Sequence, residues 1–278
     1  MNAPSAPAAA PPMVPAPPAG RRIRAERSVG LGDATPRGRL RLDALARYLQ
    51  DVGDDDAVSA RLDGDGAWIV RRAALVVRRH GAVRDRLELT TFCSGMGSRW
   101  AERRTIVRGL DGSVLDVDAS ALWVHVDAVT GRPTRLPRRF AEVYGEAAQG
   151  RSVTARLTHG EPPAGLSRRP FPLRFADFDV MGHVNNAVYW AMLEESLAAQ
   201  PERPKAPLAV ELEFRSGLGP TSRPSLLTEA APADGEGAPR SRSCWIVDEA
   251  AGDAVAASMR AWSLIGPAGL DQRAGSTS

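Results

Sequence analysis

The segment RFADFDVMGHVNNAVYW, residues 174–190, gathers side chains that are well suited to chemistry. Asp179 can act as a base or a nucleophile, and His183 can orient water, bond a carbonyl group or hold Asp179. Apolar residues at helical spacing follow, so we expect a helix to begin near Asn186 and to present free main-chain amides. Gly182 allows a substrate to approach the main chain closely. The segment is therefore predicted to be a turn that aims a carboxylate and a helix N-terminus at one point.

The same residues also have ordinary structural interpretations. Asp177 and Asp179 are of a type that turns favour, and Asn185 or Asn186 could serve only as a helix cap. A single histidine such as His183 can equally be a structural residue. Local chemistry alone leaves both interpretations open for the aspartates and the histidine. The asparagines are expected mainly to cap the helix or to bond across an interface between units.

The turn has a counterpart earlier in the chain, which indicates an internal repeat. Asp177 lies 144 positions after Asp33, and Gly182 lies 144 positions after Gly38. Two further matches follow in the same order: LVVR (75–78) with LEFR (212–215), and IVRGLDG (106–112) with IVDEAAG (246–252). Similar offsets in the same order indicate that one unit has been duplicated.

Each unit has the pattern of one long helix followed by antiparallel strands. The apolar residues at helical spacing are Leu42, Leu45, Leu49 and Val52 in the first unit, and Tyr189, Met192, Leu193 and Leu197 in the second. The strand-like runs of the first unit are 68–79, 85–92, 99–109 and 113–127. This order predicts an α+β fold in which each unit wraps an antiparallel sheet around a central helix.

The composition and the repeat together predict the domain organisation. A chain of 278 residues suits two units of about 130 residues each. The predicted parts are a disordered Pro/Ala-rich tail (1–20), a first unit with a degenerate site (21–140), a linker (141–168), a second unit with the active-site turn (169–266) and a disordered tail (267–278).

Several classes of function are disfavoured by composition. The 36 basic and 33 acidic side chains nearly balance, and the basic ones are spread along the chain, so nucleic-acid binding is not expected. No apolar run is long enough to span a membrane. Cys93 and Cys244 lack metal-ligand spacing, and His80, His125 and His159 have no acidic or cysteine neighbours at such spacing. We therefore expect no metal, no cofactor, structural thiols and a cytoplasmic location.

The helix start of the second unit carries D-x-D-x-x-G-H-V-N-N-x-x-Y, which resembles the hotdog-fold thioesterases. The tandem arrangement resembles the acyl-ACP thioesterase family, whose C-terminal half carries D-x-N-x-H-V-N-N-x-x-Y. The matching residues are Asp179, His183, Val184, Asn185, Asn186 and Tyr189. The first unit resembles that family's N-terminal half through GRLRLDALARYLQD and ALWVHVDAVTGRPTRLP, and the resemblance covers about residues 22–265.

The resemblance implies two tandem hotdog domains and a thioesterase that hydrolyses fatty acyl-ACP, or acyl-CoA, to free fatty acid and carrier thiol. Asp179 would be the base or nucleophile, His183 a second catalytic residue, and helix amides the oxyanion donors. The substrate-binding turn would consist of Gly182, Val184, Asn185 and Asn186. The partner would be acyl carrier protein or acyl-CoA, and the two units would form an intramolecular pseudo-dimer, with further homodimerisation left open.

The sequence departs from the family pattern at three positions. Met181 stands where the family has asparagine, and Gly217 and Leu218 stand where the plant enzymes have a Glu-Cys pair with assigned catalytic roles. A cysteine mechanism or a complete Asp-Asn-His-Glu network is therefore not expected. In the first unit, Thr35 and Arg39 occupy the positions of the proposed catalytic pair and cannot replace it, so we expect one active site per chain.

Two alternatives stay open at this point. The departures are compatible with an inactive protein that only binds acyl thioesters. A hydratase or dehydratase of the same fold is the other alternative, but such enzymes resemble D-x-N-P-x-H at this turn. The missing proline and the HVNN run argue against that alternative.

Overall fold

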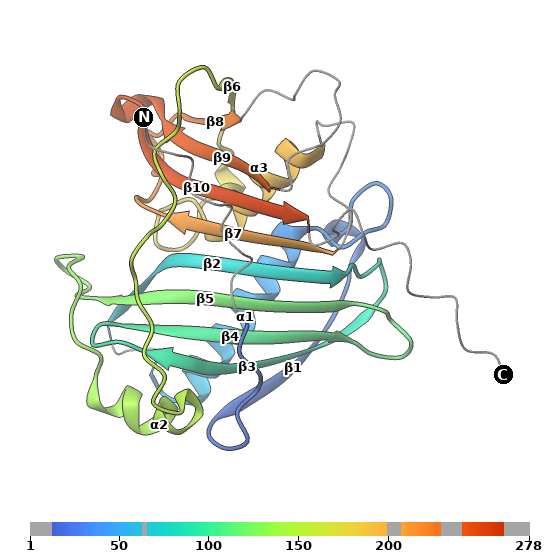
Figure 1. Ribbon diagram of the computed structural model, residues 1–278, viewed down its shortest axis with the longest axis vertical. Coiled ribbons are helices and arrows are strands. Elements are labelled where there is room, and N and C mark those ends of the chain that lie inside the picture. The colour runs from blue at the N-terminus through green and yellow to red at the C-terminus, as the bar shows by residue number, and fades with distance from the viewer. Residues whose placement is uncertain (1–12, 63–65, 199–206, 229–240, 264–278) are drawn as a thin grey trace.

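The computed structural model describes residues 13–62, 66–198, 207–228 and 241–263. Within these residues, ten strands form one antiparallel sheet in the order β1-β3-β4-β5-β2-β7-β10-β9-β8-β6 (Figure 1). The strands are β1 (Arg22–Ser28), β2 (Ala67–Arg79), β3 (Arg86–Met96), β4 (Trp100–Gly109), β5 (Asp116–Val126), β6 (Ser167–Pro170), β7 (Leu208–Phe214), β8 (Pro224–Thr228), β9 (Ser241–Asp248) and β10 (Ala254–Ser263). The helices are α1 (Leu42–Ser59), α2 (Arg138–Ala148) and α3 (Asn186–Ala198).

The sheet is built from two copies of one unit related by a pseudo-two-fold axis. β1 to β5 surround α1 and β6 to β10 surround α3, and the strand order of the second copy is the reverse of the first. The copies join where β2 pairs antiparallel with β7. Ala74 pairs with Glu211, which lies 137 positions later, so the axis passes through this pair. The predicted α+β fold with two tandem hotdog units is confirmed.

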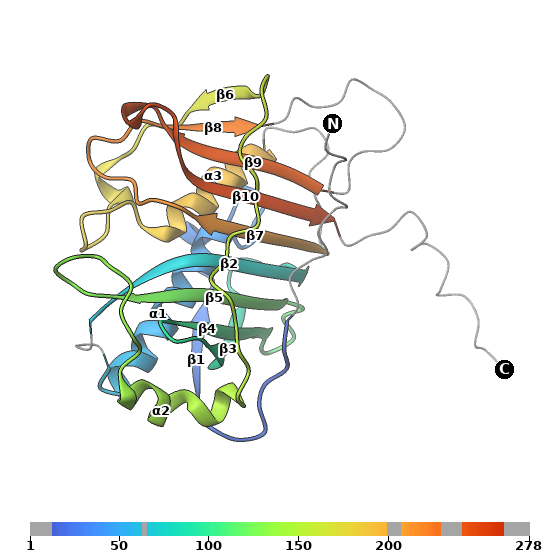
Figure 2. The ribbon, with the colours of Figure 1, turned by 60° about the vertical axis from the view of Figure 1, so that its left-hand side comes forward.

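The alternation of side chains along the central strands determines which face of the sheet the helices cover. Leu75 and Val77 of β2, and Val210 and Leu212 of β7, belong to the same buried cluster as the apolar residues of α1 and α3. We call this face of the sheet the inner face and the opposite one the outer face. In both ribbon views α1 and α3 lie behind the sheet, with residues 151–166 running across its front (Figure 2). Burial of alternate apolar side chains fixes the register.

The structure differs from the predicted linker, residues 141–168, because the first part of this segment is helical. α2 covers residues 138–148 and buries Phe140 and Tyr144 against the β3 side of the first unit. These two aromatic residues are four positions apart and lie on one helix face, a signal that the surrounding arginine, glycine and proline residues obscured. The hydroxyl of Tyr144 donates to the buried carboxylate of Asp56 on α1 at 2.9 Å, which ties α2 to the first unit.

The chain after α2 crosses the outer face from one unit to the other. Trp100 Nε1 donates to the Val153 carbonyl at 2.8 Å, and Arg72 donates to the Arg156 carbonyl at 3.2 Å. At the far side, Trp245 Nε1 donates to the carbonyl of Gly160 at 2.9 Å. The connection is therefore bonded to the sheet along its length.

Part of the segment predicted as a disordered N-terminal tail is ordered. Met13 packs against Val76, Ala209 and Trp262 on the outer face, and Arg104 Nε donates to the Val14 carbonyl at 3.1 Å. An apolar residue and a free carbonyl beside a buried arginine were enough to fix a segment without periodicity. Residues 1–12, and the predicted tail at 267–278, lie outside the described residues.

Candidate active site

The turn before α3 is held by Asp177, which is almost fully buried. Its carboxylate accepts hydrogen bonds from the Arg174 main-chain N–H at 2.7 Å and from the Arg174 guanidinium. Its carbonyl accepts from the Asn185 N–H at 2.8 Å. Asp177 therefore connects the start of the turn to the start of α3 and has a structural role.

Asp179 lies at the tip of this turn with half of its carboxylate free. Its Oδ1 accepts from the Met181 N–H at 2.9 Å, while no described residue bonds Oδ2. The main chain closes around it through Asp179 N–H to the His183 carbonyl at 2.9 Å and Gly182 N–H to the Asp179 carbonyl at 3.0 Å. Gly182 has a φ of +73°, a conformation that glycine adopts without strain. The turn thus fixes the backbone and leaves one carboxylate oxygen available.

α3 begins at Asn186, as the sequence predicts, and its first turn is only partly capped. Asn185 Oδ1 accepts from the Ala187 N–H at 2.9 Å, and the Asn185 carbonyl accepts from the Val188 N–H at 2.9 Å. The Asn186 N–H has no partner within the described part of the chain. A free amide at the positive end of a helix is a donor for a developing negative charge.

A cavity of about 870 Å³ connects this turn with the interior of the first unit. Asp179, Asn185 and Asn186 belong to its lining, as do Phe140 and Tyr144 of α2 on the opposite side of the first unit. Small side chains create much of the space: Gly53 and Ala57 of α1, and Ala73, Ala101, Ala119 and Ala121 of the sheet. A long apolar group could therefore extend from the turn into the first unit.

Three of the six predicted site residues do not line the cavity. Val184 is buried in the core, and Gly182 is exposed at the turn. His183 is also exposed, and its ring lies beside Gly217, where an added Cβ would be 3.5 Å from Cδ2. The described residues offer the His183 side chain no hydrogen-bond partner. Of the three roles considered for His183, a hydrogen bond to Asp179 is not formed, because Asp179 lines the cavity whereas the His183 ring lies outside it beside Gly217.

The positions that depart from the family pattern have structural roles. The Leu218 carbonyl accepts from the Val184 N–H at 2.9 Å, and the Leu218 side chain is 1% exposed. Gly217 leaves room for the His183 ring. Met181 is exposed, and its main-chain N–H bonds Asp179. None of these three side chains can supply a charge to the site.

The first unit has the same turn, but there the N-terminus of the following helix is already bonded. Thr35 N–H donates to the Arg39 carbonyl at 2.7 Å, and Gly38 N–H donates to the Thr35 carbonyl at 2.8 Å, matching the second unit. Here, however, Glu194 of α3 accepts from the Leu42 N–H at 2.7 Å and forms an ion pair with Arg39. The α1 N-terminus is thus occupied by a carboxylate of the protein itself.

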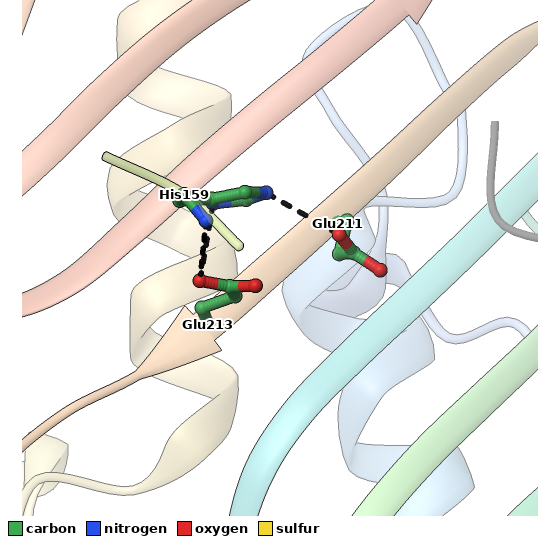
Figure 3. Close-up of side chains that lie close together, drawn as sticks. All are labelled: His159, Glu211 and Glu213. Carbon is green, nitrogen blue, oxygen red and sulfur yellow. Dashed lines mark hydrogen bonds and ion pairs between the residues drawn. The ribbon is translucent and has the colours of Figure 1, made fainter. Parts of the chain in front are cut away.

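A histidine cluster on the outer face could not be found from local sequence. His159 Nε2 lies 3.3 Å from Glu211 Oε1, and Nδ1 lies 3.1 Å from Ser258 Oγ (Figure 3). Glu213 accepts from the His159 main-chain N–H at 2.9 Å and from the N–H and hydroxyl of Thr158. The three acid and imidazole groups lie within 4.8 Å of one another.

This cluster holds the connection between the units against the sheet, and we call His159, Glu211 and Glu213 the clasp. The two carboxylates lie on different sides of the imidazole ring, and the oxygens of Glu213 are already bonded to the crossing segment. The acidic partners come from β7, far along the chain from His159, which is why sequence spacing did not reveal them. The arrangement supplies buried hydrogen bonds, and we assign it no metal.

The buried thiol of Cys93 also lines the cavity. Burial raises the pKa of Cys93 to about 11, and its Sγ lies 3.6 Å from the Gly95 carbonyl oxygen. A thiol with so high a pKa is a poor nucleophile near neutral pH. Cys93 is therefore part of the wall of the cavity.

Comparison with known proteins gives matches in both units. The family model of the acyl-ACP thioesterase N-terminal domain matches residues 21–144, and that of the C-terminal domain matches residues 160–241. An uncharacterized protein of Mycobacterium tuberculosis is 30% identical over 180 residues, covering 64% of this chain and 71% of that protein. The chloroplastic palmitoyl-acyl carrier protein thioesterase of Arabidopsis thaliana is 27% identical over 219 residues; the match covers 69% of this chain and 51% of the plant protein.

Solved structures share the whole architecture. The 12:0-ACP thioesterase from Umbellularia californica superposes with a TM-score of 0.68 at 19% identity, covering 87% of this chain and 96% of that one. A putative oleoyl thioesterase from Lactobacillus plantarum gives a TM-score of 0.69 at 17% identity, covering 89% and 97%. Within the described residues, no helix is both long enough and apolar enough to cross a membrane.

Proposed function

The chain belongs to the acyl-ACP thioesterase family, and from this premise we propose that it hydrolyses fatty acyl thioesters of acyl carrier protein or CoA. One observation carries the proposal: a carboxylate with a free oxygen and a helix amide without a partner line the same apolar cavity. These groups are Asp179 Oδ2 and the Asn186 N–H. Hydrolysis needs such a base or nucleophile together with a donor for the oxyanion.

In this mechanism Asp179 takes a proton from water as the water oxygen attacks the thioester carbon. The carbonyl electrons move to oxygen, and the Asn186 N–H, at the positive end of α3, stabilises the negative charge. Collapse of this intermediate breaks the carbon–sulfur bond. The thiolate takes the proton from Asp179, and the products are a fatty acid and the carrier thiol. His183 has no assigned step.

The acyl chain would occupy the cavity of the first unit. Alanine and glycine residues of α1 and of the inner face of the sheet leave space, while the Trp68 and Trp123 side chains add apolar surface to the wall. Removal of alkyl chain from water contributes about 0.8 kcal/mol per methylene, so a cavity of this kind favours long acyl groups over short ones. The first unit would then bind the acyl chain, and the second would supply Asp179 and the helix N-terminus for the reaction.

Three alternatives differ from this proposal, one in mechanism and two in function. Asp179 could attack the thioester directly, which would give an acyl anhydride that water then hydrolyses. An inactive protein that only binds acyl thioesters is favoured by one observation, the position of His183 outside the cavity beside Gly217. A hydratase or dehydratase is disfavoured by the HVNN sequence. A cytoplasmic location, homodimerisation and the domain limits of the sequence analysis stay predictions.

The deciding experiment is hydrolysis of a panel of acyl-ACPs and acyl-CoAs of increasing chain length by the purified protein. Release of free thiol, with fatty acid as the second product, would support a thioesterase. Tight binding of an acyl thioester without turnover would favour the inactive binding protein. A hydroxyacyl or enoyl product would favour the hydro-lyase.

A further inference from the structure

The two central helices are in register with each other at a constant offset. Leu42 begins α1 and Asn186, 144 positions later, begins α3. The preceding turns share their main-chain bonds at the same offset, as Asp33 N–H to Gly30 and Asp177 N–H to Arg174 illustrate. Where a residue of α3 contacts the first unit across the axis, the matching residue of α1, 144 positions earlier, is therefore expected to face the same part of the second unit.

In the first unit the residue across the axis is an anion. Glu194 of α3 accepts from the Leu42 N–H at 2.7 Å and is also paired with Arg39, so its carboxylate occupies the positive end of α1. Glu194 is 12% exposed in its side chain, and charge-assisted bonds of this kind are short and strong. No second anion can use that helix end while Glu194 is in place.

The residue at the matching place in the second unit is Gln50, 144 positions before Glu194. Gln50 of α1 lines the cavity together with Asn186, the residue whose N–H corresponds to that of Leu42. Neither the Gln50 amide nor the Asn186 N–H has a hydrogen-bond partner among the described residues. Where the first site has the Glu194 carboxylate, the second site has the Gln50 amide. The second site therefore lacks the internal anion and has an additional N–H donor at the matching position.

We propose that Gln50 is a second oxyanion donor, supplied by the first unit to the active site of the second. This inference rests on the proposed thioester hydrolysis. The Gln50 Nε2–H and the Asn186 N–H would both donate to the thioester carbonyl oxygen, and more strongly once attack places negative charge on it. Gln50 gains or loses no proton, so the proton still passes from water to Asp179 and then to the leaving thiolate.

The same comparison gives a reason for the expected inactivity of the first site. Among the described residues, the Gln50 amide and the Asn186 N–H of α3 are unpaired at the second site, whereas the matching Glu194 carboxylate bonds the N-terminus of α1 at the first. The matched positions at which the polar groups of the two sites differ include Asp179 against Thr35, His183 against Arg39, and Gln50 against Glu194.

Kinetics of Gln50→Met and Gln50→Glu test the donor role. Methionine has nearly the same length but cannot donate, and loss of one oxyanion donor typically lowers kcat about 10²-fold. Glutamate at this position would fill the α3 N-terminus as Glu194 fills that of α1, so its kcat should fall at least as far. Both variants should keep the KM within a few-fold. Glu194→Gln is the matched control, with kcat within a few-fold of wild type and a lower Tm.

A readout independent of turnover separates a donor from a packing residue. In an Asp179→Asn background, the carbonyl stretch of a bound carbon-13-labelled acyl-CoA should move to higher frequency when Gln50→Met is added. An unchanged frequency, or an unchanged kcat in an otherwise active enzyme, would overturn the inference and leave the thioesterase proposal standing. Wild-type protein that hydrolyses no acyl thioester would overturn both.

Discussion

The Met181 main-chain N–H donates to Asp179 Oδ1 at 2.9 Å, which fixes the carboxylate through one oxygen and leaves the other for chemistry. Asparagine can accept the same hydrogen bond through its own Oδ1 but cannot take a proton from water. We therefore expect Asp179→Asn to lower kcat by about 10²-fold or more with little change in Tm. Steady-state hydrolysis and thermal unfolding of the same preparation check this.

Asp177→Asn is the matched control, because it makes the same chemical change two residues earlier. Asp177 is buried and bonded through both oxygens to Arg174, so loss of its charge should destabilise the fold by about 1–3 kcal/mol. If Asp179→Asn instead turned over normally, the active site would have to lie elsewhere.

The turn of the first unit should tolerate changes that the second does not. Among the described residues, Thr35 Oγ1 accepts only from the Arg39 N–H, at 3.2 Å, so Thr35→Val should leave kcat within a few-fold of wild type. Thr35→Asp should not create a second site, because Glu194 still bonds the Leu42 N–H. Titration of active sites by a single-turnover burst would check this; two equivalents of product per chain in Thr35→Asp would contradict it.

The local periodicity of the chain predicted much of the fold. β2 was expected over 68–79 and is formed by Ala67–Arg79, and α3 starts at the predicted Asn186. These elements carry strong alternation or helical spacing within a few residues. α2 was missed because its buried face carries only two large side chains, Phe140 and Tyr144, beside the small Ala147 and Ala148. The clasp at His159 was missed because its partners come from a distant strand.

The candidate site was predictable only in part, for a similar reason. Asp179 and the helix start are local in the sequence, and both are found at the cavity. The cavity itself depends on which alanines share the inner face and on what lies opposite them. Gln50 has no signal of its own, since its role appears only when α1 and α3 face each other across the axis.

Filling the cavity should change which acyl chains are accepted. Ala121 lies on the inner face of β5 and lines the cavity, so Ala121→Leu would reduce its volume. We expect kcat/KM for the longest accepted acyl chain to fall roughly 10-fold or more, with shorter chains little affected. Ala82→Leu, at an exposed position, is the control and should leave the profile unchanged. An equal loss for all chain lengths would place the acyl group elsewhere.

Stability should fall in mild acid because of His80. Burial, followed by the nearby charge of Arg39, lowers the pKa of His80 to about 4. The unfolded chain then binds a proton at higher pH than the folded one. The stability that the neutral His80 ring contributes is therefore fully present above about pH 6.5 and is lost as the pH falls towards 4. Urea unfolding at pH 7 and pH 5 should show a loss of about 1–2 kcal/mol that is absent in His80→Asn. An identical pH dependence in the two proteins would contradict it.

The clasp on the outer face should stabilise the connection between the units. Glu213 is fully buried and accepts from the Thr158 N–H at 2.6 Å and the His159 N–H at 2.9 Å. In Glu213→Gln one of these N–H groups would face an amide NH₂ group, which also donates, so we expect a loss of about 1–3 kcal/mol in unfolding free energy. Protease cleavage within residues 151–161 should also become faster. Glu211→Gln should cost less, since Glu211 is partly exposed and its polar contacts among the described residues are an ion pair with Arg72 and the His159 ring. A rise in Tm on adding zinc to the wild type would instead indicate that the cluster binds a metal.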